Sequence, residues 1–305
     1  MSRTYDSMLV LHGFTFDQFS EQNRPWLCGD DHDHEPAYIF CPEVFQFPDG
    51  SSHVKIACRL DGHVLIVASP NDERELMEII LAKDALDRMG FIGVDLAMPY
   101  WLGSRQDRVC DHGEPLTTKV YADLINSCYF RRVHIWHPHS LVTPALIDGA
   151  VVHEGIAKEV IARWSRDNML LVAPDAGAAK MTFDLSKYAG VPMVSAEKVR
   201  DMRTGKILNF ALHAGHEDIE GKDVFVVDDC ISNGGTFLGL LTKIREQLPR
   251  TVQLVVTHAD HATGVMNMVG PGKFDHVYIS NSRTWTNKIS RSGPKISVIE
   301  LNFKM

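Results

Sequence analysis

The segment at residues 224–237, VFVVDDCISNGGTF, decides the fold of this chain of 305 residues. Its leading apolar residues are typical of a strand that is buried on both faces of a parallel sheet. A short polar loop follows, and the next apolar stretch, residues 237–244, predicts a helix. Because the ligands of open α/β sheets bind at the carboxyl ends of the strands, this loop is a candidate binding site.

The residue types in this loop point to a phosphorylated sugar. Gly234 and Gly235 allow the backbone to wrap closely around an anion, and the free N–H groups of the next helix favour a phosphate. Asp228 and Asp229 repel a phosphate, so we expect them to face sugar hydroxyls or a divalent cation. An ordinary strand-to-helix connection has the same outline, but two adjacent acids are costly at a strand end without a partner.

The composition is that of a soluble globular protein. Hydrophobic residues make up 45% of the chain, charged residues make up 23%, and the formal net charge is −8. A nucleic-acid surface is normally basic, so we expect no nucleic-acid partner. The cysteines form no CxxC pair, and we find no signal-peptide pattern and no long apolar run. These features predict reduced thiols, a cytoplasmic protein and no membrane contact.

Apolar strands alternate with amphipathic helices along the chain. Strands are expected at residues 8–12, 63–68, 95–99, 132–136, 169–173, 192–195, 207–213, 224–227, 253–257 and 276–279, and helices at 71–89, 117–127, 154–164, 178–188 and 237–244. This alternation predicts an α/β fold with mostly parallel sheets that are flanked by helices. Residues 63–86 and 224–244 share one plan, so we expect two similar domains, joined near residues 141–150.

Three further segments at predicted strand ends carry candidate binding residues. Residues 171–180, LVAPDAGAAK, place Asp175 and small residues before a helix, which leaves room for a phosphate, although a plain tight turn looks the same. Residues 99–108, PYWLGSRQDR, carry arginines that can grip a polyphosphate, or else form a solvated loop. His139 is a candidate for a metal or phosphate contact, and it projects to the same side as His137 if the extended geometry persists.

Two charged segments have both a functional and a simpler interpretation. Residues 196–206, AEKVRDMRTGK, form a predicted loop with four cations, which either stabilises charge in phosphoryl transfer or is merely solvated. Residues 30–35, DDHDHE, resemble a metal site by composition, but we expect a solvated loop because no periodic structure fixes these side chains.

Taken together and in this order, these segments resemble the ribose-phosphate pyrophosphokinase (PRPP synthetase) family from about residue 44 to about residue 285. The matching segments are FPDGS at 47–51, PYWLGSRQDR at 99–108, HPH at 137–139, PDAGAAK at 174–180, KVR at 198–200 and the loop at 228–236. The resemblance implies two phosphoribosyltransferase-like domains: residues 1–145 on the ATP side and residues 146–305 on the ribose-phosphate side. It also implies a homo-oligomer in which dimers assemble into hexamers.

The resemblance implies transfer of the β,γ-diphosphoryl group of Mg²⁺-bound ATP to the C1 hydroxyl of ribose 5-phosphate, with release of AMP. The residues implied for ATP are Phe47, Asp49, Arg105, Gln106 and Asp107. The residues implied for the ribose phosphate are Asp228, Asp229, Ser232, Asn233, Gly234, Gly235 and Thr236. Lys198, Arg200 and His139 are the implied catalytic residues, and His139 and Asp175 are implied to organise Mg²⁺.

The chain also departs from the family pattern. Ser51 replaces a glutamate, which bears on adenine recognition, and His137 replaces an acid. The loop SNGGT at residues 232–236 replaces DTCGT, and the lost acid and added glycine predict a roomier, less negative loop. We therefore also consider a larger acceptor, the terminal ribose of ADP-ribose in NAD rebuilding. A type I phosphoribosyltransferase and a non-catalytic regulatory homologue are further alternatives. The first 40 or so residues do not resemble the family.

Overall fold

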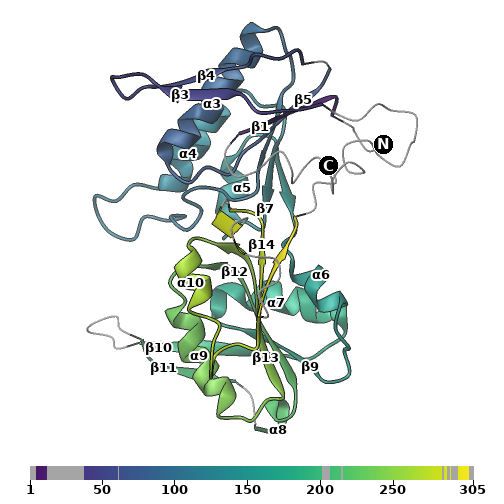
Figure 1. Cartoon of the computed structure of the whole chain (residues 1–305). Helices are drawn as coiled ribbons and strands as arrows, with labels where there is room; N and C mark the ends of the chain where they lie inside the picture. The colour runs from purple at the N-terminus through teal and green to yellow at the C-terminus, as the bar shows by residue number, and fades with distance from the viewer. Residues whose placement is uncertain are drawn as a thin grey trace. The chain divides into compact units, whose positions relative to one another are not determined.

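The computed structural model describes residues 5–11, 38–60, 62–200, 207–213, 216–283, 285–286, 289 and 295–301 (Figure 1). The acidic segment at residues 30–35 lies outside these residues, as do Arg203 and Lys206. Within the described part of the chain, no helix combines the length and the apolar character needed to cross a bilayer.

The chain divides into two compact units. The first comprises Met1–Glu154, Ser282–Thr284 and Asn302–Met305, and the second comprises Gly155–Asn281 and Trp285–Leu301. The first unit therefore continues past residue 145, where we expected the division, because a further strand at Ala150–His153 pairs with its sheet. Each unit contains one large sheet with helices, as the alternating pattern predicts.

The first unit is built on a six-stranded parallel sheet of strand order β2-β1-β5-β6-β7-β8. Its strands are β1 (Ser7–Val10), β2 (Tyr38–Phe40), β5 (Val64–Val67), β6 (Asp95–Met98), β7 (Val133–Trp136) and β8 (Ala150–His153), and its helices are α3 (Glu73–Arg88), α4 (Thr117–Asn126) and α5 (Val142–Leu146). One face of the sheet packs against α3 and α4 in a single apolar cluster. A separate antiparallel hairpin consists of β3 (Glu43–Gln46) and β4 (Ser52–Lys55).

Helix α3 shows how the sequence specifies this unit. Asp72 caps the helix, because its side chain accepts a hydrogen bond from the backbone N–H of Glu75 at 2.9 Å. Leu76, Ile79 and Leu86 are buried at helical spacing and join the core. The helix predicted at residues 71–89 is thus confirmed, with Asp72 and Met89 as its caps.

The second unit is built on a seven-stranded sheet of strand order β11-β10-β9-β12-β13-β14-β15, in which only the β10–β11 pair is antiparallel. Its strands are β9 (Met169–Ala173), β10 (Met193–Arg200), β11 (Ile207–Leu212), β12 (Asp223–Ile231), β13 (Thr251–Ala259), β14 (His276–Ser280) and β15 (Ile296–Ile299). Its helices are α6 (Ala157–Ala162), α7 (Ala176–Ala189), α8 (His216–Ile219), α9 (Gly235–Arg245) and α10 (Ala262–Met266).

The core of the second unit fixes the central strands. Val224 and Val226 of β12 pack in one apolar cluster with Leu240 of α9. Phe225 points the opposite way along the strand and meets the ring of Trp164 at 5.1 Å between centroids. Because β9, β12 and β13 run parallel and adjacent, their carboxyl ends meet at one edge of the sheet.

Candidate active site

The predicted phosphate loop of the second unit, residues 232–236, follows β12 directly and extends into the first turn of α9. The predicted ends of these two elements are wrong: the strand continues to Ile231 and the helix begins at Gly235. The strand is longer because it pairs with β13 through Asp228 and as far as Ile231, opposite Ala259. The helix begins earlier because Gly234 caps it with a φ of 79°, a conformation that glycine adopts without steric cost.

The acidic residues at the end of β12 lie in an electronegative environment. Asp228 has its pKa raised well above the usual range by burial, and then by the negative charges of Asp229 and Asp175. The Asp228 carboxylate accepts a hydrogen bond from the backbone N–H of Asp229 at 2.9 Å, which opposes this rise only in part. Such a group favours hydroxyl donors or a cation as neighbours. Among the described residues, no three His, Cys, Asp or Glu residues are already arranged to hold a metal ion.

Asp175 lies between β9 and α7, at the strand end adjacent to β12 in the sheet. Its carboxylate caps α7, because it accepts hydrogen bonds from the N–H groups of Gly177 at 3.0 Å and Ala178 at 3.2 Å. The helix therefore begins at Ala176, two residues before the predicted start at 178. The structure brings Asp175 into electrostatic range of Asp228.

Asp260 is a residue of this site that sequence reasoning missed. It follows β13, and its carboxylate accepts a hydrogen bond from the hydroxyl of Ser232. We expected the loop to be less negative, but the residue after the neighbouring strand, Asp260, supplies an acid beside it. Nor does the added glycine leave extra room, since the Met268 side chain fills the space beside Gly234. An acid three residues after the strand predicted at 253–257 was the available signal, but strand order was needed to place it beside Ser232.

Lys198 and Arg200 belong to β10, and the structure describes only their backbone. We expected a loop from residue 196, but the strand continues to Arg200 because β11 pairs with it in antiparallel register. Lys198 is opposite Phe210, and the register is irregular between Val199 and Arg200.

In the first unit, Phe47 and Asp49 lie in the turn of the β3–β4 hairpin. The turn is held by backbone hydrogen bonds between Phe47 and Ser51 at 2.8 Å and between Gly50 and Phe47 at 2.9 Å. Ser51 also donates to the Asp49 carboxylate from its N–H at 2.9 Å and from its hydroxyl at 2.7 Å. These bonds lower the pKa of Asp49, so Ser51 holds the carboxylate charged and fixed in direction.

An exposed ring cluster covers one face of the same hairpin. It consists of Phe45, Phe47 and His53, with ring centroids 5.0 to 5.5 Å apart. Phe45 is 43% exposed and Phe47 is 46% exposed. The cluster offers aromatic faces on which a nucleobase can stack. Sequence reasoning missed Phe45 and His53, which lie opposite each other only because β3 and β4 pair.

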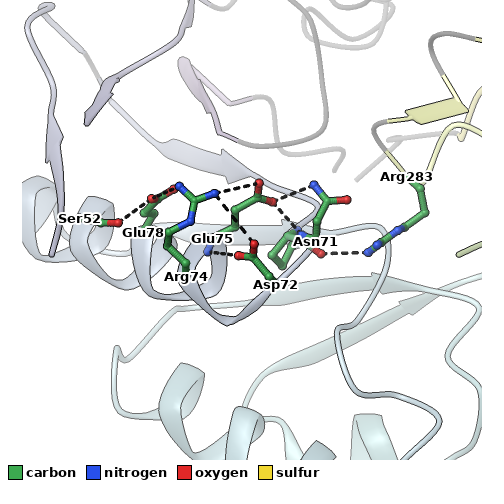
Figure 2. Close-up of polar contacts among 8 residues, drawn as sticks. Ser52, Asn71, Asp72, Arg74, Glu75, Glu78 and Arg283 are labelled. Atoms are coloured by element: carbon green, nitrogen blue, oxygen red, sulfur yellow. Dashed lines mark hydrogen bonds and ion pairs between the residues drawn. The ribbon is translucent and has the colours of Figure 1, made fainter. Parts of the chain in front are cut away.

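The hairpin is anchored on α3 by polar contacts with the buried Glu78, which Figure 2 shows. The hydroxyl of Ser52 in β4 donates to the carboxylate of Glu78 at 2.7 Å. Arg74 approaches the same carboxylate at 3.5 Å from one turn earlier in the helix. Glu78 is fully buried, so these contacts fix the base of the hairpin on α3.

The structure brings together the segments at residues 99–108 and 137–139, both of the first unit. Burial acts to raise the pKa of Asp107, but hydrogen bonds from Ser140 and Arg108 and the charges of Arg108 and His139 outweigh it and lower the pKa. Arg108 Nε lies 3.0 Å from the Asp107 carboxylate. Asp107 thus joins the two segments, while Arg105, Gln106 and His139 are exposed to solvent.

The extended geometry assumed for His137 and His139 does not persist. Strand β7 ends at Trp136, and His137 has a φ of 41°, in the left-handed region that few residues other than glycine adopt. The N–H of His137 donates to the carbonyl of His153 at 2.9 Å, which fixes this turn. The two histidines therefore cannot be placed on one side by strand alternation.

Two family models match successive parts of the chain. The model of the N-terminal domain of ribose phosphate pyrophosphokinase matches residues 37–128, and the phosphoribosyl transferase domain model matches residues 150–269.

Curated ribose-phosphate pyrophosphokinases align with most of the chain. The chain is 29% identical to the one from Thermococcus kodakarensis, over 81% of this chain and 87% of that protein. It is 29% identical to the one from Pyrococcus abyssi, over 86% and 89%. It is 30% identical to the one from Methanopyrus kandleri, over 71% and 75%.

A solved structure shares the fold. The crystal structure of phosphoribosylpyrophosphate synthetase from Mycobacterium smegmatis superposes with a TM-score of 0.76 at 21% identity. The superposition covers 96% of this chain and 94% of that chain, so the two-domain α/β fold extends over nearly the whole sequence.

Proposed function

The chain belongs to the ribose-phosphate pyrophosphokinase family, and we propose that it transfers the β,γ-diphosphoryl group of ATP to the C1 hydroxyl of ribose 5-phosphate, releasing AMP. The observation that carries this proposal is the acidic group of Asp175, Asp228 and Asp229, at the sheet edge that also carries the phosphate loop. An acidic group beside an anion-binding loop suits a ligand with hydroxyls at one end and a phosphate at the other.

The second unit holds the acceptor in this proposal. The carboxylates of Asp228 and Asp229 accept hydrogen bonds from the ribose hydroxyls. The N–H groups of residues 232–236 and the start of α9 bind the 5′-phosphate, because α9 is an 11-residue helix whose first N–H groups point into the loop. In this assignment Ser232, Asn233, Gly234, Gly235 and Thr236 form the phosphate cradle.

The first unit holds ATP. The ring cluster of Phe45, Phe47 and His53 stacks on the adenine, since a base gains about 1–3 kcal/mol from an aromatic face. Asp49 accepts a hydrogen bond from the nucleotide. Arg105 and Gln106 are exposed and contact the polyphosphate, and Asp107 holds their segment in place.

Lys198, Arg200 and His139 are the proposed catalytic residues. Two cations on one strand can stabilise the charge that develops on a diphosphoryl group in transit, an effect that is large in a site shielded from water. His139 is exposed beside Asp107, so it is accessible to a polyphosphate bound in the first unit.

Magnesium fits the donor groups of the second unit. The raised pKa of Asp228 reflects burial together with repulsion by Asp229 and Asp175, and a divalent cation relieves that repulsion. Mg²⁺ prefers carboxylate oxygens and keeps several waters, so Asp175 is a suitable ligand, and His139 remains the second proposed metal residue. When bound, the metal would neutralise negative charge on the phosphates.

Ribose 5-phosphate is the acceptor that the structure favours over ADP-ribose. ADP-ribose was considered because the loop has lost an acid and gained a glycine. The neighbouring segment compensates for both changes: Asp260 supplies an acid, and Met268 occupies the space beside Gly234. The acceptor assay below includes both compounds, because larger ligands extend beyond the loop.

Product analysis by mass spectrometry tests the proposal. The protein is mixed with ATP and Mg²⁺ and either ribose 5-phosphate or ADP-ribose. We expect AMP and phosphoribosyl diphosphate from the first acceptor, and no transfer when EDTA removes the metal. AMP release without any acceptor, or faster transfer to ADP-ribose, would overturn the assigned acceptor.

Two controls address the remaining alternatives. A phosphoribosyltransferase would consume phosphoribosyl diphosphate and a base without ATP, and a non-catalytic homologue would form no product under any condition.

Analytical ultracentrifugation of the same preparation tests the homo-oligomer that the resemblance implies, and a single monomeric species would contradict it.

A further inference from the structure

Asp260 and Ser232 leave the sheet side by side. They directly follow Ala259 and Ile231, the last paired residues of β13 and β12. The N–H of Asp260 donates to the carbonyl of Ile231 at 2.9 Å, so the pairing continues one bond beyond the strands. The Asp260 carboxylate accepts a hydrogen bond from the Ser232 hydroxyl, and the thiol of Cys230 lies 3.5 Å from its other oxygen. One carboxylate therefore contacts the first loop residue and the strand that leads to it.

The chain that follows Asp260 packs against the same loop. Gly264 lies so close that a β-carbon there would overlap the carbonyl of Ser232, and a β-carbon at Gly234 would overlap the Met268 side chain. We call residues 260–268 the brace. The brace thus meets the phosphate loop at three places: the Ser232 hydroxyl, the Ser232 carbonyl and the α-carbon of Gly234.

This arrangement divides the donors of the loop into two groups. A hydroxyl has one proton, and Ser232 donates its proton to Asp260, so that hydroxyl is not a donor to a phosphate in this state. The backbone N–H groups of the loop remain for the anion. Their directions depend on the loop shape, and the brace fixes that shape before the ligand arrives. Such preorganisation raises affinity because less freedom is lost on binding.

We propose that Asp260 is a positioning residue of the acceptor site, which holds the phosphate loop through Ser232 in the shape that binds the 5′-phosphate of the acceptor. The inference deepens the proposed function and rests on it. The bond joins one hydroxyl and one carboxylate, so the two groups can exchange places: an acid at position 232 and a hydroxyl at position 260 restore the same pairing.

A side-chain exchange tests the role of Asp260. Asp260→Ser should raise the KM for ribose 5-phosphate about tenfold, as expected from the loss of a charge-assisted hydrogen bond, and leave the KM for ATP unchanged. Ser232→Asp alone should raise it further, because two carboxylates then face each other. The double variant Ser232→Asp with Asp260→Ser should return the KM to within about threefold of the parent value, a non-additivity typical of contacting residues.

Asp223→Asn is the matched control. Asp223 joins the same two strands at their other end, where its carboxylate accepts from Arg250 Nε at 2.8 Å and from the Thr251 hydroxyl at 2.6 Å. This variant should lower Tm and leave the KM for ribose 5-phosphate unchanged. If Asp260→Ser behaves like Asp223→Asn, or if the double variant is as impaired as Asp260→Ser, Asp260 has only a structural role and the inference fails.

Calorimetry with ribose 5-phosphate alone separates this inference from the proposed function. Binding is measured without turnover, so the same ranking of the variants is expected in Kd. A parent protein that binds ribose 5-phosphate but releases no AMP would refute the proposed function and not the role of Asp260. Equal Kd values in parent and Asp260→Ser would refute that role even if the parent is fully active.

Discussion

The phosphate loop of the second unit and the β3–β4 hairpin of the first carry their functional residues on different supports. The loop continues buried parallel strands, and it is held by β12, β13 and the brace. The hairpin lies outside the large sheet of its unit, its rings are exposed, and it is fixed by its own turn and by the Ser52–Glu78 contact. In the proposed assignment, a sugar phosphate therefore binds a loop that is held by the core, whereas a nucleobase binds an exposed surface.

Residues of the loop are linked to the core, so a change there affects both stability and binding. Residues of the hairpin turn are bonded mainly to one another, so a change there should affect nucleotide binding with little effect on the fold.

The largest effect is expected from the double variant Asp228→Asn with Asp229→Asn. It keeps the shape of both side chains but removes the charge, so activity should fall about 1000-fold or more. Stability should change in the opposite direction. A carboxyl whose pKa is raised in the folded state destabilises that state once the pH exceeds its usual pKa, so Tm at pH 7.5 should rise.

Steady-state kinetics and thermal unfolding of the same preparation check the expected fall in activity and the expected rise in Tm. A variant that loses activity and Tm together would mean that the two acids stabilise the fold, contrary to the destabilisation inferred from the raised pKa of Asp228.

Phe47→Ala should raise the KM for ATP about tenfold, which corresponds to the loss of one stacked ring. The KM for ribose 5-phosphate and Tm should stay near the parent values, because Phe47 is 46% exposed. Phe183→Ala is the matched control, since Phe183 is 47% exposed on α7 of the second unit. Equal changes in the KM for ATP in both variants would remove the hairpin from the nucleotide site.

Lowering the pH should change the stability of the two units in opposite directions. In the first unit, burial and then the charge of His153 lower the pKa of His134 to about 4. His134 is nearly fully buried and its Nδ1 lies 2.9 Å from Nε2 of His153. Its contribution to stability is present above the ordinary histidine pKa of about 6.5 and is lost as the pH falls toward 4. The loss should reach about 2 kcal/mol at pH 5.

In the second unit, the raised pKa of Asp228 has the opposite consequence, because protonation at low pH relieves its repulsion with Asp229 and Asp175. Denaturant unfolding at pH 5 and pH 7.5 measures both effects. His134→Gln should flatten the acid loss of the first unit, and an unchanged slope in this variant would assign that loss to other groups.

The smallest effect is expected from Ser51→Ala. The substitution removes the hydroxyl bond to Asp49 but keeps the N–H bond, so the KM for ATP should rise only about twofold to threefold. Ser51→Gly is a useful comparison, because it removes the same hydroxyl and also loosens the turn. A rise of tenfold or more for Ser51→Ala would mean that Ser51 contacts the nucleotide directly.

The sequence predicts the buried parts of this fold better than the exposed ones. The strand at Met169–Ala173 is found at its predicted bounds, because five buried apolar residues form a continuous run. The β3–β4 hairpin was not predicted, since Glu43–Gln46 is exposed throughout and carries no hydrophobic pattern. The end of β12 was misplaced because polar residues pair with β13, and pairing depends on strand order rather than on local sequence.

In the candidate site, features within one segment were likewise predicted better than contacts between segments. Motifs within one segment, such as the loop at 232–236 and the turn at Asp175, are followed by the predicted helices, although both helices begin two residues earlier than predicted. Contacts between segments were not available from one sequence. Asp260 lies 28 residues after Ser232, and only the adjacency of β12 and β13 brings them together. The charge of the loop was therefore misjudged from its own residues.

The most direct test of the central claim is ³¹P NMR of the protein with ATP, Mg²⁺ and ribose 5-phosphate. Transfer of a diphosphoryl group predicts that AMP and phosphoribosyl diphosphate appear at equal rates, with no ADP. Formation of ADP with a ribose bisphosphate, or an unchanged ATP spectrum beside bound ribose 5-phosphate, would contradict the account.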